Sequence, residues 1–239
     1  MYNTKSEKKV AILQPNYVPW RGYFDLIQHC DLLILFDHAQ YTTSDWRNRN
    51  LVKTPTGLSW MTIPVGKAIH RTIAEVTIAD PRWQRTHWNT LESNYRRAIH
   101  AEWAFDWLRS IYRGREYATL SDVNHSLIRE ICKKLQIHVP IISSLELGIS
   151  KKKEHPSDHV LNMCLEVGAS VYISGGAGRN YLRERDFWEH GISLKWFEYS
   201  KYPEYQQLWG EYQEKVSILD LFFNCGPNSL DYLSGTYNS

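Results

Sequence analysis

The chain has 239 residues, of which 43% are hydrophobic and 23% charged, a balance typical of a water-soluble protein with a sizeable core. Its formal charge of +2 and the lack of a long Lys/Arg run argue against general nucleic-acid binding. Its polar start is followed by only four apolar residues, too few for a signal peptide, and no window approaches a membrane span, so we expect a cytoplasmic protein without membrane insertion.

The N-terminal elements predict a parallel sheet. Residues 10–13 and 32–36 are short, continuous apolar runs separated by a helix at about 20–30, a pattern typical of buried strands in a βαβ unit. Further strands are predicted at 58–65 and 73–78. The second of these alternates polar and apolar residues, which predicts that one of its faces is exposed to solvent.

Helices dominate the middle of the chain, from about residue 82 to 135, and the last of them is predicted to begin with Ser121 as its N-cap. The charged stretch 150–158 is predicted to be a solvated connection or a helix entry. The remaining elements are predicted in this order: a strand at 139–142, a helix at 157–167, a strand at 170–174, a helix at 183–190, a strand at 192–198 and a helix at 216–223.

This alternation predicts an α/β fold, a three-layer sandwich with a mostly parallel sheet and a helical insertion, in a single domain over residues 1–239. The four cysteines show neither C-x-x-C spacing nor a histidine at zinc-finger distance, so we expect no metal site. The sequence identifies no cofactor. Ten tryptophans and fifteen tyrosines are predicted to belong mostly to an aromatic core, with stacking on sugar or base rings as the functional alternative.

The first βα turn offers one group of candidate binding residues. Ligands of open α/β sheets bind at the carboxyl ends of the strands, and a helix N-terminus presents unpaired N–H groups to an anion. The alternative is a tight turn whose aromatic side chains simply pack. The candidate substrate-binding residues here are Gln14, Asn16, Tyr17, Trp20 and Tyr23.

The second strand ends at Asp37, where a denser group of polar residues begins. Asp37 or His38 is a candidate base. Gln40 and Tyr41 are candidates for hydrogen bonds to hydroxyls. The run Arg47, Asn48, Arg49 and Asn50 favours a polyanionic or sugar ligand, with the arginines gripping phosphate oxygens. The alternative is a solvated loop that caps neighbouring elements.

A glycine-rich turn and a few isolated side chains complete the candidates. Residues 175–180 follow a strand and precede a helix, the setting of a phosphate cradle, or else of a turn that needs positive φ angles. His87 is a third candidate base, although a lone histidine on a helix is more often a surface or capping residue, and the same holds for Asn124 and His125. Asp220 lies in an apolar run and needs a partner, for which Arg47 or Arg49 is expected. The candidate binding residues of the glycine-rich turn are Gly175, Gly176, Arg179 and Asn180.

Five segments together resemble the WbqC-like protein family, and the resemblance covers residues from about 10 to 226. The segments are Q-P-N-Y-V-P-W-R-G-Y-F-D-L-I, F-D-H-A-Q-Y, W-R-N-R-N, Y-I-S-G-G-A-G-R-N-Y-L and S-I-L-D-L-F-F-N-C-G. The resemblance implies a setting in bacterial O-antigen and other surface-polysaccharide biosynthesis, and an aminoacyl, possibly glycyl, transfer to a sugar. Position 38, a histidine here, usually holds another residue in the family.

We therefore expect a transferase that places an acyl or aminoacyl group on the amine of a nucleotide-linked amino sugar. The base is Asp37, His38 or His87, and the donor is carried by CoA, a carrier protein or tRNA. One alternative is an ATP-dependent adenylating ligase for an amino acid, although the paired histidines of H-x-G-H are missing. Another is a sugar-nucleotide-binding protein without catalysis.

Overall fold

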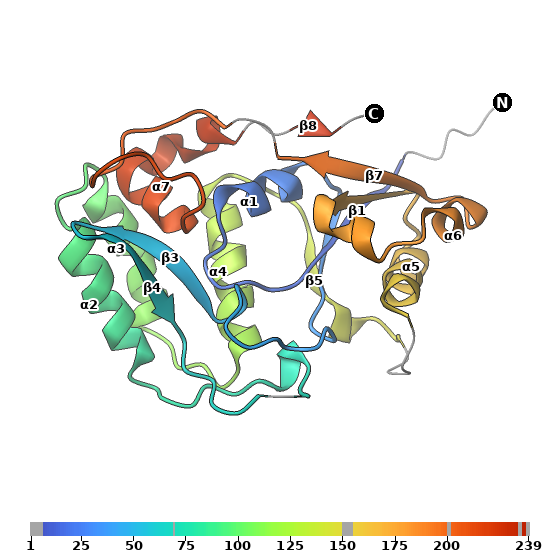
Figure 1. The fold of residues 1–239 in the computed structure, drawn as a ribbon, viewed down its shortest axis with the longest axis horizontal. Coiled ribbons are helices and arrows are strands. Elements are labelled where there is room, and N and C mark those ends of the chain that lie inside the picture. The colour runs from blue at the N-terminus through green and yellow to red at the C-terminus, as the bar shows by residue number, and fades with distance from the viewer. Residues whose placement is uncertain (1–6, 69, 150–154, 200–201, 234–235, 238–239) are drawn as a thin grey trace.

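The computed structural model describes residues 7–68, 70–149, 155–199, 202–233 and 236–237. Within them, six strands form the central sheet (Figure 1), and five of the six are parallel. The short edge strand β8 (Thr236–Tyr237) is antiparallel to its neighbour β7. In spatial order the parallel strands are β5 (Ile141–Ser143), β2 (Leu32–Leu35), β1 (Lys9–Leu13), β6 (Val171–Gly175) and β7 (Ser193–Glu198).

The strand order changes direction between β1 and β6. From β1 the chain moves outward to β2 and then to β5, and it returns to the centre with β6, which pairs with β1. From β6 it moves outward in the opposite direction to β7. Parallel sheets of this kind bind ligands in the crevice outside the carboxyl ends of the two strands at this reversal. The topology alone therefore points to the turns after β1 and β6.

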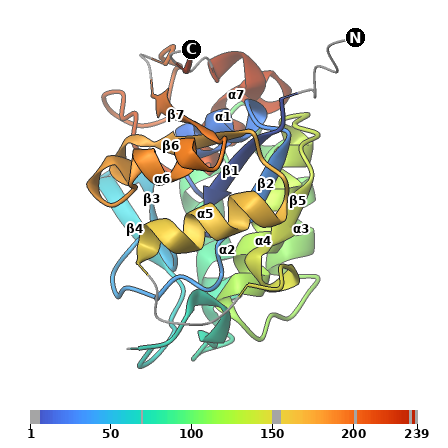
Figure 2. The same cartoon turned by 90° about the vertical axis from the view of Figure 1, so that its right-hand side faces the viewer.

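Helices cover both faces of the sheet, because right-handed crossovers on the two sides of β1 lie on opposite faces. Val10 and Ile12 of β1 pack in one apolar cluster with helices α5 (Pro156–Glu166) and α6 (Glu184–Glu189). Ala11 belongs to the other cluster, with α1 (Arg21–Gln28) and α4 (Leu120–Lys134). Figure 2 shows α5 crossing in front of the strands. The predicted three-layer α/β sandwich is confirmed.

The section between β2 and β5 forms a body beside the sheet (Figure 1). It contains a two-stranded antiparallel hairpin and three helices, and the C-terminal helix α7 (Ile218–Cys225) packs against it. Its elements are β3 (Arg49–Thr54), β4 (Gly57–Thr62), α2 (Trp83–Tyr95), α3 (Ala101–Tyr112) and α4. The predicted helical section over about 82–135 corresponds to α2, α3 and α4.

Two local predictions are wrong. Residues 73–78 do not form a strand: Ile73–Glu75 is one 3₁₀ turn, closed by a capping box between Thr72 and Glu75. Helix α4 begins two residues earlier than expected, because Thr119 is its N-cap and accepts a hydrogen bond from the Asp122 amide (3.1 Å). The polar start and the charged stretch 150–158 were interpreted from residues that include 1–6 and 150–154, which lie outside the described part. Within that part, we find no helix with the length and apolar character needed to cross a bilayer.

Candidate functional site

A cavity of about 1040 Å³ lies at the reversal of the strand order. It is bounded by the carboxyl ends of β1 and β6, by the loops that follow β2, and by the start of α5. Its volume is at the upper end of the range for small-molecule sites. Six residues proposed from the sequence line it: Gln14, Asn16, His38, Gln40, Arg47 and Gly175.

The turn after β1 and the loop at 42–47 converge because Asn124 holds both. This fully buried amide on α4 donates from Nδ2 to the carbonyls of Pro15 and Arg47, each at 2.8 Å. The Tyr17 amide also donates to the Trp46 carbonyl (2.9 Å), and Arg47 donates to the Gln14 side chain. The loops that sequence analysis treated separately therefore form one wall of the cavity.

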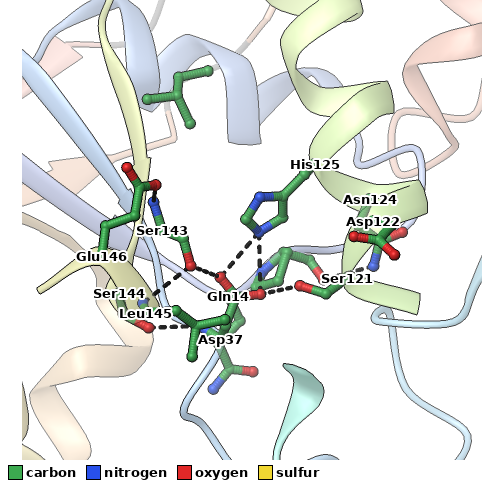
Figure 3. A network of polar contacts seen from close by, with 12 residues as sticks. Gln14, Asp37, Ser121, Asp122, Asn124, His125, Ser143, Ser144, Leu145 and Glu146 are labelled. Atoms are coloured by element: carbon green, nitrogen blue, oxygen red, sulfur yellow. Dashed lines mark hydrogen bonds and ion pairs between the residues drawn. The ribbon is translucent and has the colours of Figure 1, made fainter. Parts of the chain in front are cut away.

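Behind this wall, the carboxylate of Asp37 is the centre of a buried network (Figure 3). Ser143 Oγ, at the end of β5, donates to Asp37 Oδ2 (2.6 Å). His125 Nε2, on α4, lies 3.0 Å from the same oxygen, and Ser121 donates to Oδ1. Asp37 thus joins the end of β2 to β5 on one side and to α4 on the other.

The donors around Asp37 decide its charge. Burial alone would raise the pKa of this fully buried carboxyl. The hydrogen bond and Coulomb attraction of His125, with the hydroxyls of Ser121 and Ser143, outweigh burial and lower the pKa below its usual value. A carboxylate that is saturated with donors and absent from the cavity lining is a poor proton acceptor for a substrate. The role that fits Asp37 is to position its neighbours.

Ser144 connects this network to the cavity through His38. The buried Ser144 Oγ accepts the Asp37 amide (3.0 Å) and lies 3.0 Å from His38 Nδ1. Ser144 Oγ also accepts the His38 amide (3.4 Å), so amides occupy both of its lone pairs and its hydroxyl proton points to Nδ1. A neutral imidazole with this bond carries its own proton on Nε2. In this tautomer His38 is a hydrogen-bond donor rather than a base.

A second segment runs beside His38 and adds a carboxylate to the same wall. The Ala74 amide donates to the Asp37 carbonyl (3.1 Å), and the Ile73 amide donates to the Ala39 carbonyl (2.9 Å). These bonds place Glu75, one residue further on, in the cavity lining. Glu75 Oε2 accepts the Thr72 amide (2.8 Å), which fixes the carboxylate in place. Sequence analysis missed this residue because it interpreted the segment as a strand.

Tyr17 and His87, both sequence candidates, lie in the core and do not line the cavity. His87 Nε2 lies 3.1 Å from the Thr62 carbonyl, and its Nδ1 lies 2.7 Å from the Tyr17 hydroxyl. That hydroxyl is 2.5 Å from the hydroxyl of Tyr112. Burial lowers the pKa of His87 to about 4, so the ring is neutral near pH 7. The contacts of the His87 ring fix α2 against Thr62 and Tyr17. Tyr17 and His87 are therefore part of the core and not of the proposed site.

The other aromatic candidates support the cavity from outside its lining. The Trp20 ring packs against Tyr199 and Tyr202 and covers Gly22, where a Cβ atom would lie 2.3 Å from the indole. Tyr23 donates to the Gln14 carbonyl (3.0 Å). Tyr41 is buried and does not line the cavity.

Of the four polar residues at 47–50, only Arg47 lines the cavity. Asn48 is buried and donates to the Ile63 carbonyl (2.9 Å), and Asn50 is buried and donates to the Val18 carbonyl (2.9 Å). The Arg49 guanidinium stacks on the Trp60 ring, 4.2 Å from its centroid. None of these three lines the cavity. Asn48 therefore joins the two ends of the hairpin, and Asn50 fastens the hairpin to the turn after β1.

The glycine-rich turn after β6 contributes backbone rather than charge. Gly175 and Gly178 line the cavity, and a Cβ atom at Gly178 would lie 2.4 Å from Ser174 Oγ. Gly176 and Asn180 are exposed and lie outside the lining, and Arg179 stacks on the Trp196 ring at 4.4 Å. The turn is a 3₁₀ segment, Gly176–Asn180.

The prediction that Arg47 or Arg49 pairs with Asp220 is wrong. Its carboxylate accepts hydrogen bonds of 2.8 Å from Tyr95, Tyr205 and Gln207. Lys53 is the cation that affects it, and this cluster lies between α2, β3 and α7. Asp220 therefore fastens α7 to the insertion and takes no part in the cavity.

The residues that surround Asp37, hold the cavity loops and contact His38 were not among the candidates proposed from the sequence. Ser121 was interpreted as an N-cap, and Asn124 and His125 as ordinary helical residues. Ser143 and Ser144 directly follow the predicted strand at 139–142, and this position at the end of a parallel strand was the available signal. Among the described residues, we find no group of three or more His, Cys, Asp or Glu side chains placed to bind a metal ion.

Comparison with known proteins places the chain among relatives of similar length. The profile of the WbqC-like protein family matches residues 14–232. The chain is 44% identical over 229 residues to the uncharacterized protein Rv1507c of Mycobacterium tuberculosis (strain ATCC 25618 / H37Rv). The match covers 95% of this chain and 97% of that relative.

Proposed function

The chain belongs to the WbqC-like protein family, and on that premise we propose that it transfers an acyl or aminoacyl group, possibly glycyl, to the amine of a nucleotide-linked amino sugar. The proposed setting is surface-polysaccharide biosynthesis. The observation that carries the proposal is the cavity of about 1040 Å³ at the strand-order reversal, with His38 and Glu75 on one wall. A donor-poised imidazole beside a carboxylate suits acyl transfer to an amine.

The proposed reaction forms one bond and breaks one. The amine nitrogen attacks the carbonyl carbon of the activated acyl group, and the bond from that carbon to the sulfur or oxygen of the donor breaks. His38 Nε2–H donates to the carbonyl oxygen as negative charge develops on it. Glu75 accepts the proton that the amine loses and passes it to the leaving thiolate or alkoxide, so Glu75 returns to its carboxylate form and the charges balance.

Asp37 and Ser144 are positioning residues in this scheme. Ser144 selects the tautomer of His38 by donating to Nδ1, and the Asp37 amide orients Ser144. Removing the Ser144 hydroxyl, or the Asp37 carboxylate that holds Ser143 at the end of β5, is expected to change the placement of the imidazole without removing a reacting group. Gln14, Asn16 and Gln40 line the same cavity and are proposed to contact the sugar.

Mass spectrometry of reaction mixtures tests the proposal. Purified protein is incubated with nucleotide amino sugars and with acyl or aminoacyl donors on CoA, a carrier protein or tRNA, and the acylated sugar is sought. His38→Ala and Glu75→Gln are expected to lower product formation by about 100-fold, the usual range for one acid–base or oxyanion group. His190→Ala, at the exposed C-cap of α6, is the matched control and should leave the rate unchanged.

Other results would replace the proposal. Pyrophosphate release that requires ATP and an amino acid would assign the protein to the adenylating ligases. Tight binding of a nucleotide sugar with no product across all three donor classes would assign it to the sugar-nucleotide-binding proteins without catalysis.

A further inference from the structure

Three side chains from the loop at 42–47 and the β3–β4 hairpin form a stack that ends at the cavity. The Arg49 guanidinium lies 4.2 Å from the Trp60 ring centroid, and the Trp60 and Trp46 centroids are 5.5 Å apart with an interplanar angle of 44°. Trp46 lines the cavity. Both indoles are nearly half exposed, Trp46 at 45% and Trp60 at 43%.

The backbone beneath this stack is held on both sides. The Trp46 carbonyl accepts the Tyr17 amide (2.9 Å), and the Asn48 carbonyl accepts the Ile63 amide (2.7 Å). Trp46 therefore has a fixed place on the wall, backed by Trp60, which is in turn backed by a cation. An exposed aromatic face that is rigidly backed at the rim of a cavity is typical of a binding surface.

We propose that Trp46 is the platform on which the pyranose ring of the substrate stacks, so that its amine points into the cavity. This inference deepens the proposed function and rests on it for the choice of a sugar. The C–H groups of a pyranose ring pack on an aromatic face, while its hydroxyls need hydrogen-bonding groups at the rim. Gln40, whose side chain is exposed, and Asp45, whose side chain keeps 30% of its surface exposed, line the cavity with Trp46.

The geometry disfavours a nucleobase between the two indoles. A planar ring sandwiched between two others needs about 7 Å between parallel planes, twice the normal contact distance. The indoles here are closer and strongly tilted. Trp60 already packs against Arg49 and Trp46. Trp46 therefore offers one face, which suits a sugar ring that stacks on one side and is hydrogen-bonded around its edge.

Calorimetric binding of UDP-glucosamine and of UDP tests this without any acyl donor. Trp46→Ala is expected to lower the affinity for UDP-glucosamine about fivefold, as removal of one aromatic contact does, and to leave the affinity for UDP unchanged. Trp46→Phe should retain part of the binding. Trp188→Ala is the matched control, because Trp188 is 77% exposed on α6, away from the lining, and it should change neither affinity.

Several outcomes would overturn the platform. One is that wild-type protein binds UDP-glucosamine no more tightly than UDP. Another is that a folded Trp46→Ala protein loses affinity for both ligands equally, which would assign the Trp46 face to the nucleobase. Self-association that Trp46→Ala abolishes would assign the face to a second copy of the chain. Sugar-dependent binding that needs Trp46, without any transfer product, would instead refute the proposed function and leave the platform standing.

Discussion

Asp37 and Asp220 are both fully buried carboxylates, yet their surroundings shift their pKa values in opposite directions. Burial raises the pKa of Asp220, and the hydrogen bonds from Tyr205, Tyr95 and Gln207, with the charge of Lys53, oppose this without cancelling it. At Asp37 the contact with His125 and two serine hydroxyls outweighs burial. A basic group in direct contact with the carboxylate is the difference.

The Lys53 ammonium does not reach Asp220 in the same way. It donates to the Gln207 side chain (2.9 Å) and to the Glu211 carbonyl, so its charge acts on Asp220 without a direct bond. The two sites also differ in place, because Asp37 ends a strand beside the cavity and Asp220 fastens α7 to the insertion. Burial of a carboxylate therefore identifies neither its charge nor its role. The donors around it do.

The largest expected effect is that of Asp37→Ala. This change leaves Ser121, Ser143 and the His125 ring without their acceptor, and we expect the free energy of unfolding to fall by about 3 kcal/mol or more, because each hydrogen bond to a charged group contributes about 1.5–3 kcal/mol. Asp220→Ala leaves two phenols and an amide unpaired and should cost about 1–3 kcal/mol. Urea unfolding measures both, and a larger loss for Asp220→Ala would contradict the comparison.

His87 titrates in the same pH range as that in which the Asp37 and Asp220 variants are compared. Its contribution to the pH dependence of stability must therefore be measured. Its pKa is lowered to about 4 by burial, so between its usual value near 6.5 and about 4 the unfolded chain binds a proton that the folded chain does not. Stability should therefore decrease as the pH falls through this window, by about 3 kcal/mol in total. His87→Gln keeps a donor for the Thr62 carbonyl, and its unfolding curves at pH 4–7 should show a correspondingly smaller slope.

Replacing each aspartate by asparagine tests whether the pKa values of Asp37 and Asp220 shift in opposite directions. Because the folded pKa of Asp37 is lowered from the usual value of 3.8, its stabilisation is present above that value and is lost as the pH falls through the folded pKa, so Asp37→Asn should cost about 2 kcal/mol at pH 7 and less below pH 3. Because the folded pKa of Asp220 is raised, its stabilisation is present at low pH and is lost as the pH rises. Asp220→Asn should therefore compare better with wild type at pH 7 than at pH 4. Slopes of the same sign in the two variants would refute the assignment.

The smallest effect is expected at Ser144. Ser144→Ala removes the acceptor for the Asp37 amide and the donor to His38 Nδ1, at a cost of about 1 kcal/mol. Nitrogen-15 NMR of the His38 ring should show the proton on Nε2 in wild type and a mixture of tautomers in the variant. Ser143→Ala, which touches Asp37 but not His38, is the control and should leave the tautomer unchanged.

The sequence by itself predicted the layers of the fold and much of the cavity wall. Continuous apolar runs at 10–13, 32–36 and 170–174 predict parallel strands, and the ends of such strands meet at one edge of a sheet. Gln14, His38, Arg47 and Gly175 could be proposed for this reason, because each lies at a strand end or in the loop that follows. Local periodicity failed at 73–78, where alternation alone does not distinguish a strand from a capped 3₁₀ turn.

Only the tertiary structure decided what each polar side chain does. His38 and His87 were both candidate bases, but His38 lines the cavity and the His87 ring is held between the Thr62 carbonyl and the Tyr17 hydroxyl. Asn124, His125 and Ser144 act across 77 to 109 residues of chain, on partners that no local pattern indicates. Strand and helix formation depends on neighbours in sequence, whereas the charge of Asp37 and the tautomer of His38 depend on atoms that the fold brings within 3 Å.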